Sequence, residues 1–205
     1  MGEIVTIHPK NPQQRLLDPI VEVIHRGGVI AYPTDSVYAL GCHIGDKQAR
    51  DRIRAIRHID KHHNFTLLCR DLSELATYAR VDNTAFRAIK ASTPGPFTFI
   101  LPATSGVPRR LMHPKRKTIG LRVPDSPIAQ ALLAELAEPM MSVTLILPGD
   151  DYPLSDPYDI RAAMEAHADV IVDGGYCGLE PTTVVDMTGP LPEIIRQGTG
   201  EFSLS

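Results

Sequence analysis

The stretch "DPIVEVIHRGGVIAY", residues 18–32, decides the fold class. Asp18 is expected to act as an N-cap, with Pro19 at the first helical position and Gly27 and Gly28 ending the helix. The apolar run VIAY that follows reads as a buried strand. The sequence therefore predicts a helix that leads directly into a strand.

The same order of signals recurs further along the chain. Segments 126–137 and 156–168 each begin with a capping residue and a proline, and each is followed by an apolar run. Helical patterns also cover 46–59 and 71–79. The expected strands are 4–7, 29–32, 65–69, 97–101, 118–123, 141–147, 170–172, 182–186 and 192–196.

Alternation of strands with helices of about ten residues is typical of an α/β sheet. Two strands close together near the end indicate an antiparallel part, so the sheet is expected to be mixed. No repeat or linker interrupts the chain of 205 residues, which predicts one domain, residues 1–205, with a core over about 15–200.

Composition narrows the classes of function. The chain is 43% hydrophobic and 22% charged, with a net charge of −3, so it has no general attraction to nucleic acid or to anionic membranes. No run approaches eighteen apolar residues, and the start lacks the pattern of a signal peptide. Three widely spaced cysteines suit reduced thiols. We expect a cytoplasmic protein with no membrane partner.

Common signatures of chemistry are absent from the sequence. It contains no G-x-x-x-x-G-K-[ST] or G-x-G-x-x-G loop, no H-E-x-x-H, no C-x-x-C and no G-x-S-x-G. His58, His62 and His63 have the closest thing to metal-ligand spacing, but no second cluster supplies the remaining ligands. No structural metal is predicted, and any nucleotide must bind without those loops.

One segment carries an unusual charge. "PRRLMHPKRKTIGLRVP", residues 108–124, holds six fixed positive charges and no carboxylate in an otherwise acidic chain. This pattern favours a bound anion, and RNA, a nucleotide and plain solvent remain open as its partner. The charges are Arg109, Arg110, Lys115, Arg116 and Lys117, expected in a loop, and Arg122, which even spacing places on the same strand face as Thr118.

Two arginines lie in apolar strands. Arg122 and Arg196 are both expected to be buried, and a buried guanidinium needs an anion beside it. That anion is either a carboxylate of the protein or a phosphate or carboxylate of a ligand. In "YPTDSVY", Thr34, Asp35 and Ser36 follow a strand, at a position where α/β proteins bind ligands or form a local turn.

Five segments in a fixed order resemble a known family. "GGVIAYPTDSVYALG", "TPGPFTFIL", "TIGLRVP", "PTTVVD" and "EIIRQG" resemble the YrdC-type threonylcarbamoyl-AMP synthase superfamily over residues 20–200. "RIRAIRHIDKHHNFTLLCRDLSELATYARVDN" and "PRRLMHPKRKTIG" resemble its YciO branch. The resemblance implies a single α/β domain whose twisted mixed sheet encloses a large electropositive cavity.

The resemblance also implies a reaction. In the synthases the cavity holds ATP, L-threonine and bicarbonate, with magnesium commonly helping. The carbamate of threonine attacks the α-phosphate, pyrophosphate leaves, and the product serves tRNA modification. By resemblance, the nucleotide side comprises Arg57, Thr118, Ser142, Thr144 and Arg196, to which we add Lys61 and His63 as candidates from the adjacent segment. The amino-acid side comprises Thr34, Tyr38, Arg122 and Thr182.

Two departures from the family pattern predict weakened or redirected chemistry. Arg57-His58-Ile59 stands where the synthases carry Lys-x-Arg, and Ser142-Val143-Thr144 stands where they carry Ser-x-Asn. Losing one charge-assisted contact costs on the order of 1.5 to 3 kcal/mol. Lys61 and His63 are the candidates to compensate.

Two alternatives to an adenylate-forming or adenylate-processing enzyme stay open. The loop charges at 109–117 could bind the backbone of double-stranded RNA or tRNA without synthase activity. Against this stand the acidic net charge and only eleven aromatic residues for base stacking. The second alternative is an inert relative whose basic run is solvated.

Overall fold

Ten strands and six α-helices make up the computed structural model, which describes residues 1–203. The strands are β1 (Glu3–Thr6), β2 (Ile30–Tyr32), β3 (Ala39–His43), β4 (Thr66–Leu68), β5 (Phe97–Pro102), β6 (Thr118–Arg122), β7 (Met140–Thr144), β8 (Val170–Asp173), β9 (Thr183–Asp186) and β10 (Glu193–Arg196). The helices are α1 (Gln14–His25), α2 (Lys47–Arg57), α3 (Leu72–Tyr78), α4 (Asn83–Ser92), α5 (Pro127–Leu136) and α6 (Pro157–Met164). A short 3-10 helix, η1, covers Arg109–Leu111.

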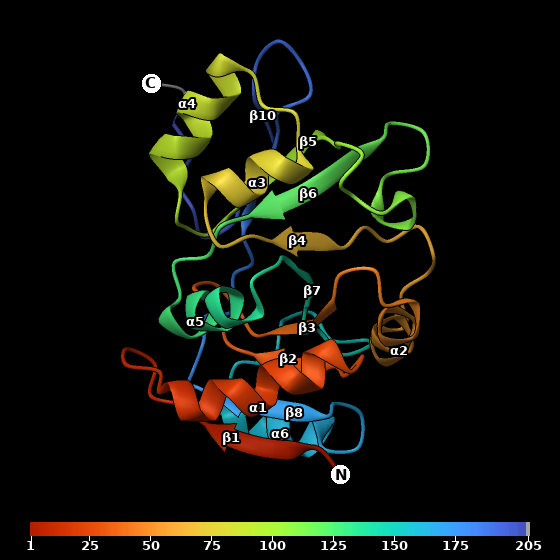
Figure 1. Cartoon of the computed structure of the whole chain (residues 1–205), viewed down its shortest axis with the longest axis vertical. Coiled ribbons are helices and arrows are strands. Elements are labelled where there is room, and N and C mark those ends of the chain that lie inside the picture. The colour runs from red at the N-terminus through yellow and green to blue at the C-terminus, as the bar shows by residue number, and fades with distance from the viewer. Residues whose placement is uncertain (204–205) are drawn as a thin grey trace.

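All ten strands join one sheet in the order β1-β8-β2-β3-β7-β4-β6-β5-β9-β10 (Figure 1). The pairs β1/β8, β2/β8, β4/β6 and β5/β9 are parallel, and the other five are antiparallel. The expected mixed α/β sheet in a single domain is confirmed for the described residues; 204 and 205 lie outside them.

Caps fix where most helices begin. Ser126 and Asp156 accept bonds from backbone N–H groups of α5 and α6, and each is followed by a proline in the first turn, as the sequence predicts. Asp71 caps α3 through the N–H of Glu74, while the Glu74 carboxylate accepts from the N–H of Arg70. This reciprocal arrangement is a capping box displaced by one residue.

The expected start of α1 is wrong. The helix begins at Gln14, four residues before Asp18, so Pro19 lies inside it. Leu17 and Ile20, on either side of the proposed cap, are both buried in the core. Apolar burial of this extra turn therefore outweighs the hydrogen bond that a proline cannot donate.

Two cores lie on opposite faces of the sheet. One packs α1 and α5 against Tyr32, Met140 and Leu68. The other packs α2, α3, α4 and α6 against residues at the alternate positions, among them Leu67 and Met141. Figure 1 shows α1 and α5 side by side, with α1 in front of β2 and with α6 beside β8. No helix among residues 1–203 is long and apolar enough to cross a membrane.

Candidate functional site

A cavity of about 510 Å³ opens where small residues replace large ones along the sheet. Ser142, Thr66 and Gly120 pair in one row across β7, β4 and β6. Two residues further along the same strands, Met140 and Leu68 fill the core beneath α1 and α5. Because the row lacks large side chains, it leaves space on that face of the sheet. The volume falls within the range of small-molecule sites.

Positive charge gathers on the lining of this cavity. Four arginines face it, Arg57, Arg116, Arg122 and Arg196, with three histidines, His62, His63 and His113. No aspartate or glutamate is among the lining residues in the part of the chain that the structure describes. The expected large electropositive cavity is therefore present, and it suits an anionic ligand.

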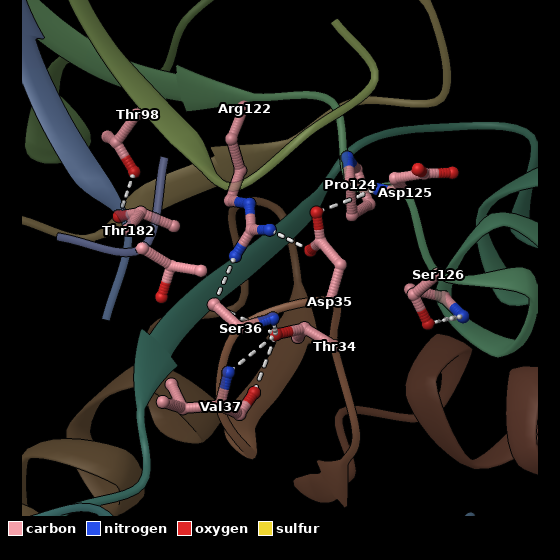
Figure 2. Close-up of polar contacts among 12 residues, drawn as sticks. Thr34, Asp35, Ser36, Val37, Thr98, Arg122, Pro124, Asp125, Ser126 and Thr182 are labelled. Atoms are coloured by element: carbon pink, nitrogen blue, oxygen red, sulfur yellow. Dashed lines mark hydrogen bonds and ion pairs between the residues drawn. The ribbon is translucent and has the colours of Figure 1, made fainter. Parts of the chain in front are cut away.

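Two of the four arginines are neutralised by carboxylates behind the wall. Arg122, only 7% exposed, donates to Asp35 and, at 3.4 Å, to the Ser36 hydroxyl (Figure 2). Asp35 also accepts from the N–H of Asp125, at the turn that follows β6. The partner of buried Arg122 is thus a protein carboxylate, while its Nε has no hydrogen-bond partner within residues 1–203.

Arg116 is the second paired arginine. Its Nη2 donates to the Asp186 carboxylate at 2.8 Å and to the Thr188 hydroxyl at 2.9 Å. Burial alone would raise the pKa of Asp186, but bonds from Arg116 and Thr188 outweigh burial and leave that pKa lowered. Asp186 therefore remains a carboxylate and holds Arg116 at the lining of the cavity.

The other two arginines have no carboxylate partner among residues 1–203. Arg57 donates its Nε to the Ile146 carbonyl at 3.0 Å, and Arg196 donates to the Thr182 carbonyl and hydroxyl. Partial burial of the guanidinium group lowers the pKa of both arginines, since it disfavours their charge. An anion in the cavity would offset that cost for both.

Hydroxyls surround these charges. Ser142, Thr118 and Thr144 line the cavity as the sequence predicts. Thr182 also lines it and shares a 2.8 Å hydrogen bond with Thr98 (Figure 2). Each hydroxyl can donate a hydrogen bond to a ligand or accept one from it, so the wall offers polar contacts of both kinds.

Thr34 lies at the same wall with its hydroxyl already in use. It accepts from the N–H groups of Ser36 and Val37 and donates to the Val37 carbonyl at 2.6 Å. Both interpretations of "PTDS" therefore apply, since the segment forms a local turn and this turn borders the cavity.

Several predicted positions need correction. Tyr38 is fully buried but is not among the lining residues, because its hydroxyl donates to the Gly175 carbonyl and accepts from the Gly174 N–H. Lys61 is exposed in the loop after α2 and does not reach the lining, whereas His63 does. Arg196 lines the cavity but is exposed rather than buried, because β10 is an edge strand with all four residues exposed.

The structure separates the five charges of the basic loop, residues 109–117, into two groups. Of the five charges from 109 to 117, only Arg116 lines the cavity. Arg109, Arg110, Lys115 and Lys117 are exposed outside it and form no ion pair within residues 1–203. These four exposed residues, which flank the lining residues His113 and Arg116 in the sequence, are called the rim below.

Sequence reasoning missed five polar lining residues, which are His62, Asn64, Thr66, Thr98 and His113. The Nδ1 atom of His113 accepts from the N–H of Arg116 at 3.1 Å, so its Nε2 carries the proton. The one available signal was the position of His113 within the basic segment. Burial, assisted by Arg57, lowers the pKa of His63 and favours its neutral imidazole at neutral pH.

Comparison with known proteins shows the family of this chain. A family model that covers Sua5, YciO and YrdC proteins and is described as "Telomere recombination" matches residues 22–198. The chain belongs to this family. It is 57% identical over 201 residues to YciO of Escherichia coli (strain K12), covering 98% of each chain. The crystal structure of E. coli YciO superposes with a TM-score of 0.94.

More distant members share the fold. A threonylcarbamoyl-AMP synthase of Serratia proteamaculans is 30% identical over 189 residues, which cover 89% of this chain and 96% of the synthase. The crystal structure of P. abyssi Sua5 complexed with L-threonine matches with a TM-score of 0.87 at 24% identity, over 95% of this chain and 57% of the Sua5 chain. This last likeness concerns the fold alone.

Proposed function

We propose that this member of the Sua5/YciO/YrdC family binds ATP in the cavity and is an adenylate-forming or adenylate-processing enzyme related to threonylcarbamoyl-AMP synthesis. One observation carries the proposal: Arg57 and Arg196 face the cavity without a carboxylate partner within residues 1–203. A polyphosphate matches two guanidiniums in charge and in geometry.

The amino-acid side of the ligand would lie toward Arg122, with Thr34 and Thr182 nearby. Asp35 already accepts a hydrogen bond from one Nη of Arg122. A ligand carboxylate would therefore bind only the remaining donors of that guanidinium. We expect moderate affinity for the amino-acid part of the ligand, since the charge of Arg122 is already compensated by Asp35.

The chemistry asks for positioning and for positive charge. An oxygen of the threonine carbamate attacks the α-phosphorus of ATP, a new P–O bond forms, and the bond to pyrophosphate breaks with its electrons leaving on the pyrophosphate oxygen. Arg57 and Arg196 would stabilise the negative charge on the phosphates, and hydroxyls of Thr118, Ser142 and Thr144 would hold the reacting groups in place. No protein nucleophile is needed.

Magnesium would have to arrive with the nucleotide. The lining residues among 1–203 include no carboxylate, and the nearby Asp35 and Asp186 are engaged by arginines. The residues present do not provide the oxygen ligands of a resident magnesium site.

The departures from the synthase pattern support weaker or altered activity. Ile59 packs against the hydrophobic core instead of entering the cavity, so the third position of the first motif contributes no charge there. Thr144 lines the cavity and keeps a hydroxyl in place of an amide. Each missing charge-assisted contact costs on the order of one to two decades in binding or rate.

A second candidate rests on the exposed rim. Arg109, Arg110, Lys115 and Lys117 are exposed and outside the ion pairs found within residues 1–203, which favours contact with RNA phosphates beside the cavity. Titration with ATP tests the first function and titration with duplex RNA tests the second. Arg57→Ala and Arg196→Ala should weaken the binding of ATP alone.

A further inference from the structure

Tyr32 is a fully buried residue whose ring reaches across the sheet. It ends β2, and its ring passes over β3 at Gly41, where an added Cβ would lie 2.8 Å from the ring carbon Cε1. Gly41 in turn pairs with Ser142 of β7. The glycine therefore lets a buried tyrosine on one strand reach a cavity-lining serine two strands away.

The hydroxyls of Tyr32 and Ser142 meet at the end of this reach. Their oxygens lie 2.5 Å apart, and neither hydroxyl has another hydrogen-bond partner within residues 1–203. Ser142 is 6% exposed, and the space it borders is the cavity. The two side chains thus form an isolated pair with an open volume on the serine side only.

The direction of the hydrogen bond follows from burial. Desolvation raises the pKa of Tyr32 to about 12, although its bond with Ser142 opposes that rise, so the phenol keeps its proton at neutral pH. If Ser142 were the donor, the buried phenol proton would have no acceptor, which costs about 1 to 3 kcal/mol. Tyr32 is therefore the donor, and Ser142 accepts.

We infer that Tyr32 is a positioning residue that turns the hydroxyl hydrogen of Ser142 into the cavity, where it donates to an anionic oxygen of the ligand. This inference rests on the proposed function, since it takes the ligand to be a nucleotide phosphate. It explains how a neutral serine adds to the donor character of a wall that already lacks carboxylates within the described residues.

A double-mutant cycle tests the inference by titration calorimetry with ATP at pH 7.5. Tyr32→Phe keeps the ring and removes the phenol donor, so the Ser142 hydrogen is free to rotate away from the ligand. We expect the Kd for ATP to rise about three- to tenfold. Ser142→Ala should raise it at least as much, and Tyr32→Phe should add nothing in the Ser142→Ala background.

Tyr38→Phe is the matched control. Tyr38 is also fully buried, but its hydroxyl bonds only to Gly174 and Gly175, away from the lining. Tyr38→Phe should lower the melting temperature by about as much as Tyr32→Phe does, but it should leave the Kd for ATP unchanged. Melting curves establish that each variant is folded before its titration.

The outcomes separate the two proposals. If wild type binds ATP and Tyr32→Phe binds it within twofold, the positioning role fails while the proposed function stands. An equal loss from Tyr32→Phe in both backgrounds would assign the effect to packing and overturn the inference. Should Tyr32→Phe not fold, wild-type affinity in Ser142→Ala would overturn it independently. If wild type does not bind ATP, the proposed function and this inference fall together.

Discussion

Arg122 and Asp35 form an ion pair in which both side chains are almost completely buried, with exposed fractions of 8% and 9%. They come from β6 and from the turn after β2, so the pair joins two distant parts of the chain at the cavity wall (Figure 2). A buried pair contributes little net stability compared with apolar residues, but breaking it is expensive. The pair therefore fixes where the Arg122 guanidinium lies.

Asp35→Ala should be strongly destabilising, because it leaves a buried guanidinium without its carboxylate. We expect a loss of about 3 to 5 kcal/mol in the free energy of unfolding, measured by urea denaturation. Asp150→Ala, which removes an exposed loop carboxylate outside every ion pair found in residues 1–203, should change it by less than about 0.5 kcal/mol. Adding Arg122→Met to Asp35→Ala should recover part of the loss; a loss below about 1 kcal/mol for Asp35→Ala would contradict the account.

The ion pair of Asp186 should make the free energy of unfolding depend on pH in the acid range. Its lowered pKa in the folded protein, maintained by Arg116 and Thr188 against burial, means that the carboxylate stabilises the fold above the unfolded value of about 4. This contribution is lost as the pH falls through the lower folded pKa. Because the Arg116 side chain is half exposed, we expect only about 1 kcal/mol at pH 7.

Urea denaturation of Asp186→Asn at pH 7 and between pH 4 and pH 2 checks this expectation. The gap in the free energy of unfolding between wild type and Asp186→Asn should be present at pH 7 and should shrink below pH 4. Asp150→Asn is the control and should follow wild type throughout. A gap that stays constant across the acid range would show that the Asp186 carboxylate does not act through its charge.

The exposed rim predicts salt-dependent affinity for RNA if the second candidate function holds. Lys115→Ala combined with Lys117→Ala should weaken binding to a duplex RNA and reduce the slope of log K against log salt by about one to two, since each cation releases about one counterion. Lys10→Ala combined with Lys90→Ala, two exposed lysines outside the rim, is the matched control. Equal affinity of wild type at low and high salt would eliminate the phosphate-contact model.

Local signals in the sequence were sufficient for most of the fold. Ser126, Asp156 and the apolar runs located their helices and strands because capping and burial act over a few residues. Strand β3 was missed because Gly41 and the preceding turn weaken the strand pattern. Helix α4, capped by Asp82, was also missed, as its apolar face is short.

The site was predictable in its composition but not in its contacts. Thr118 and Arg122 share the cavity face because their spacing is even, which a sequence reveals directly. Pairing of Arg122 with Asp35 depends on the sheet bringing residues 87 positions apart together. The exposure of Arg196 likewise follows from the edge position of β10, which no local pattern encodes.

The central claim is that Arg57 and Arg196 hold the phosphates of a nucleotide in the cavity, and titration calorimetry with ATP tests it most directly. Wild type should bind ATP, Arg57→Ala and Arg196→Ala should each weaken binding by about one to two decades, and the exposed Arg87→Ala in α4 should bind like wild type. Absence of ATP binding by wild type, or unchanged affinity in both cavity variants, would contradict the account.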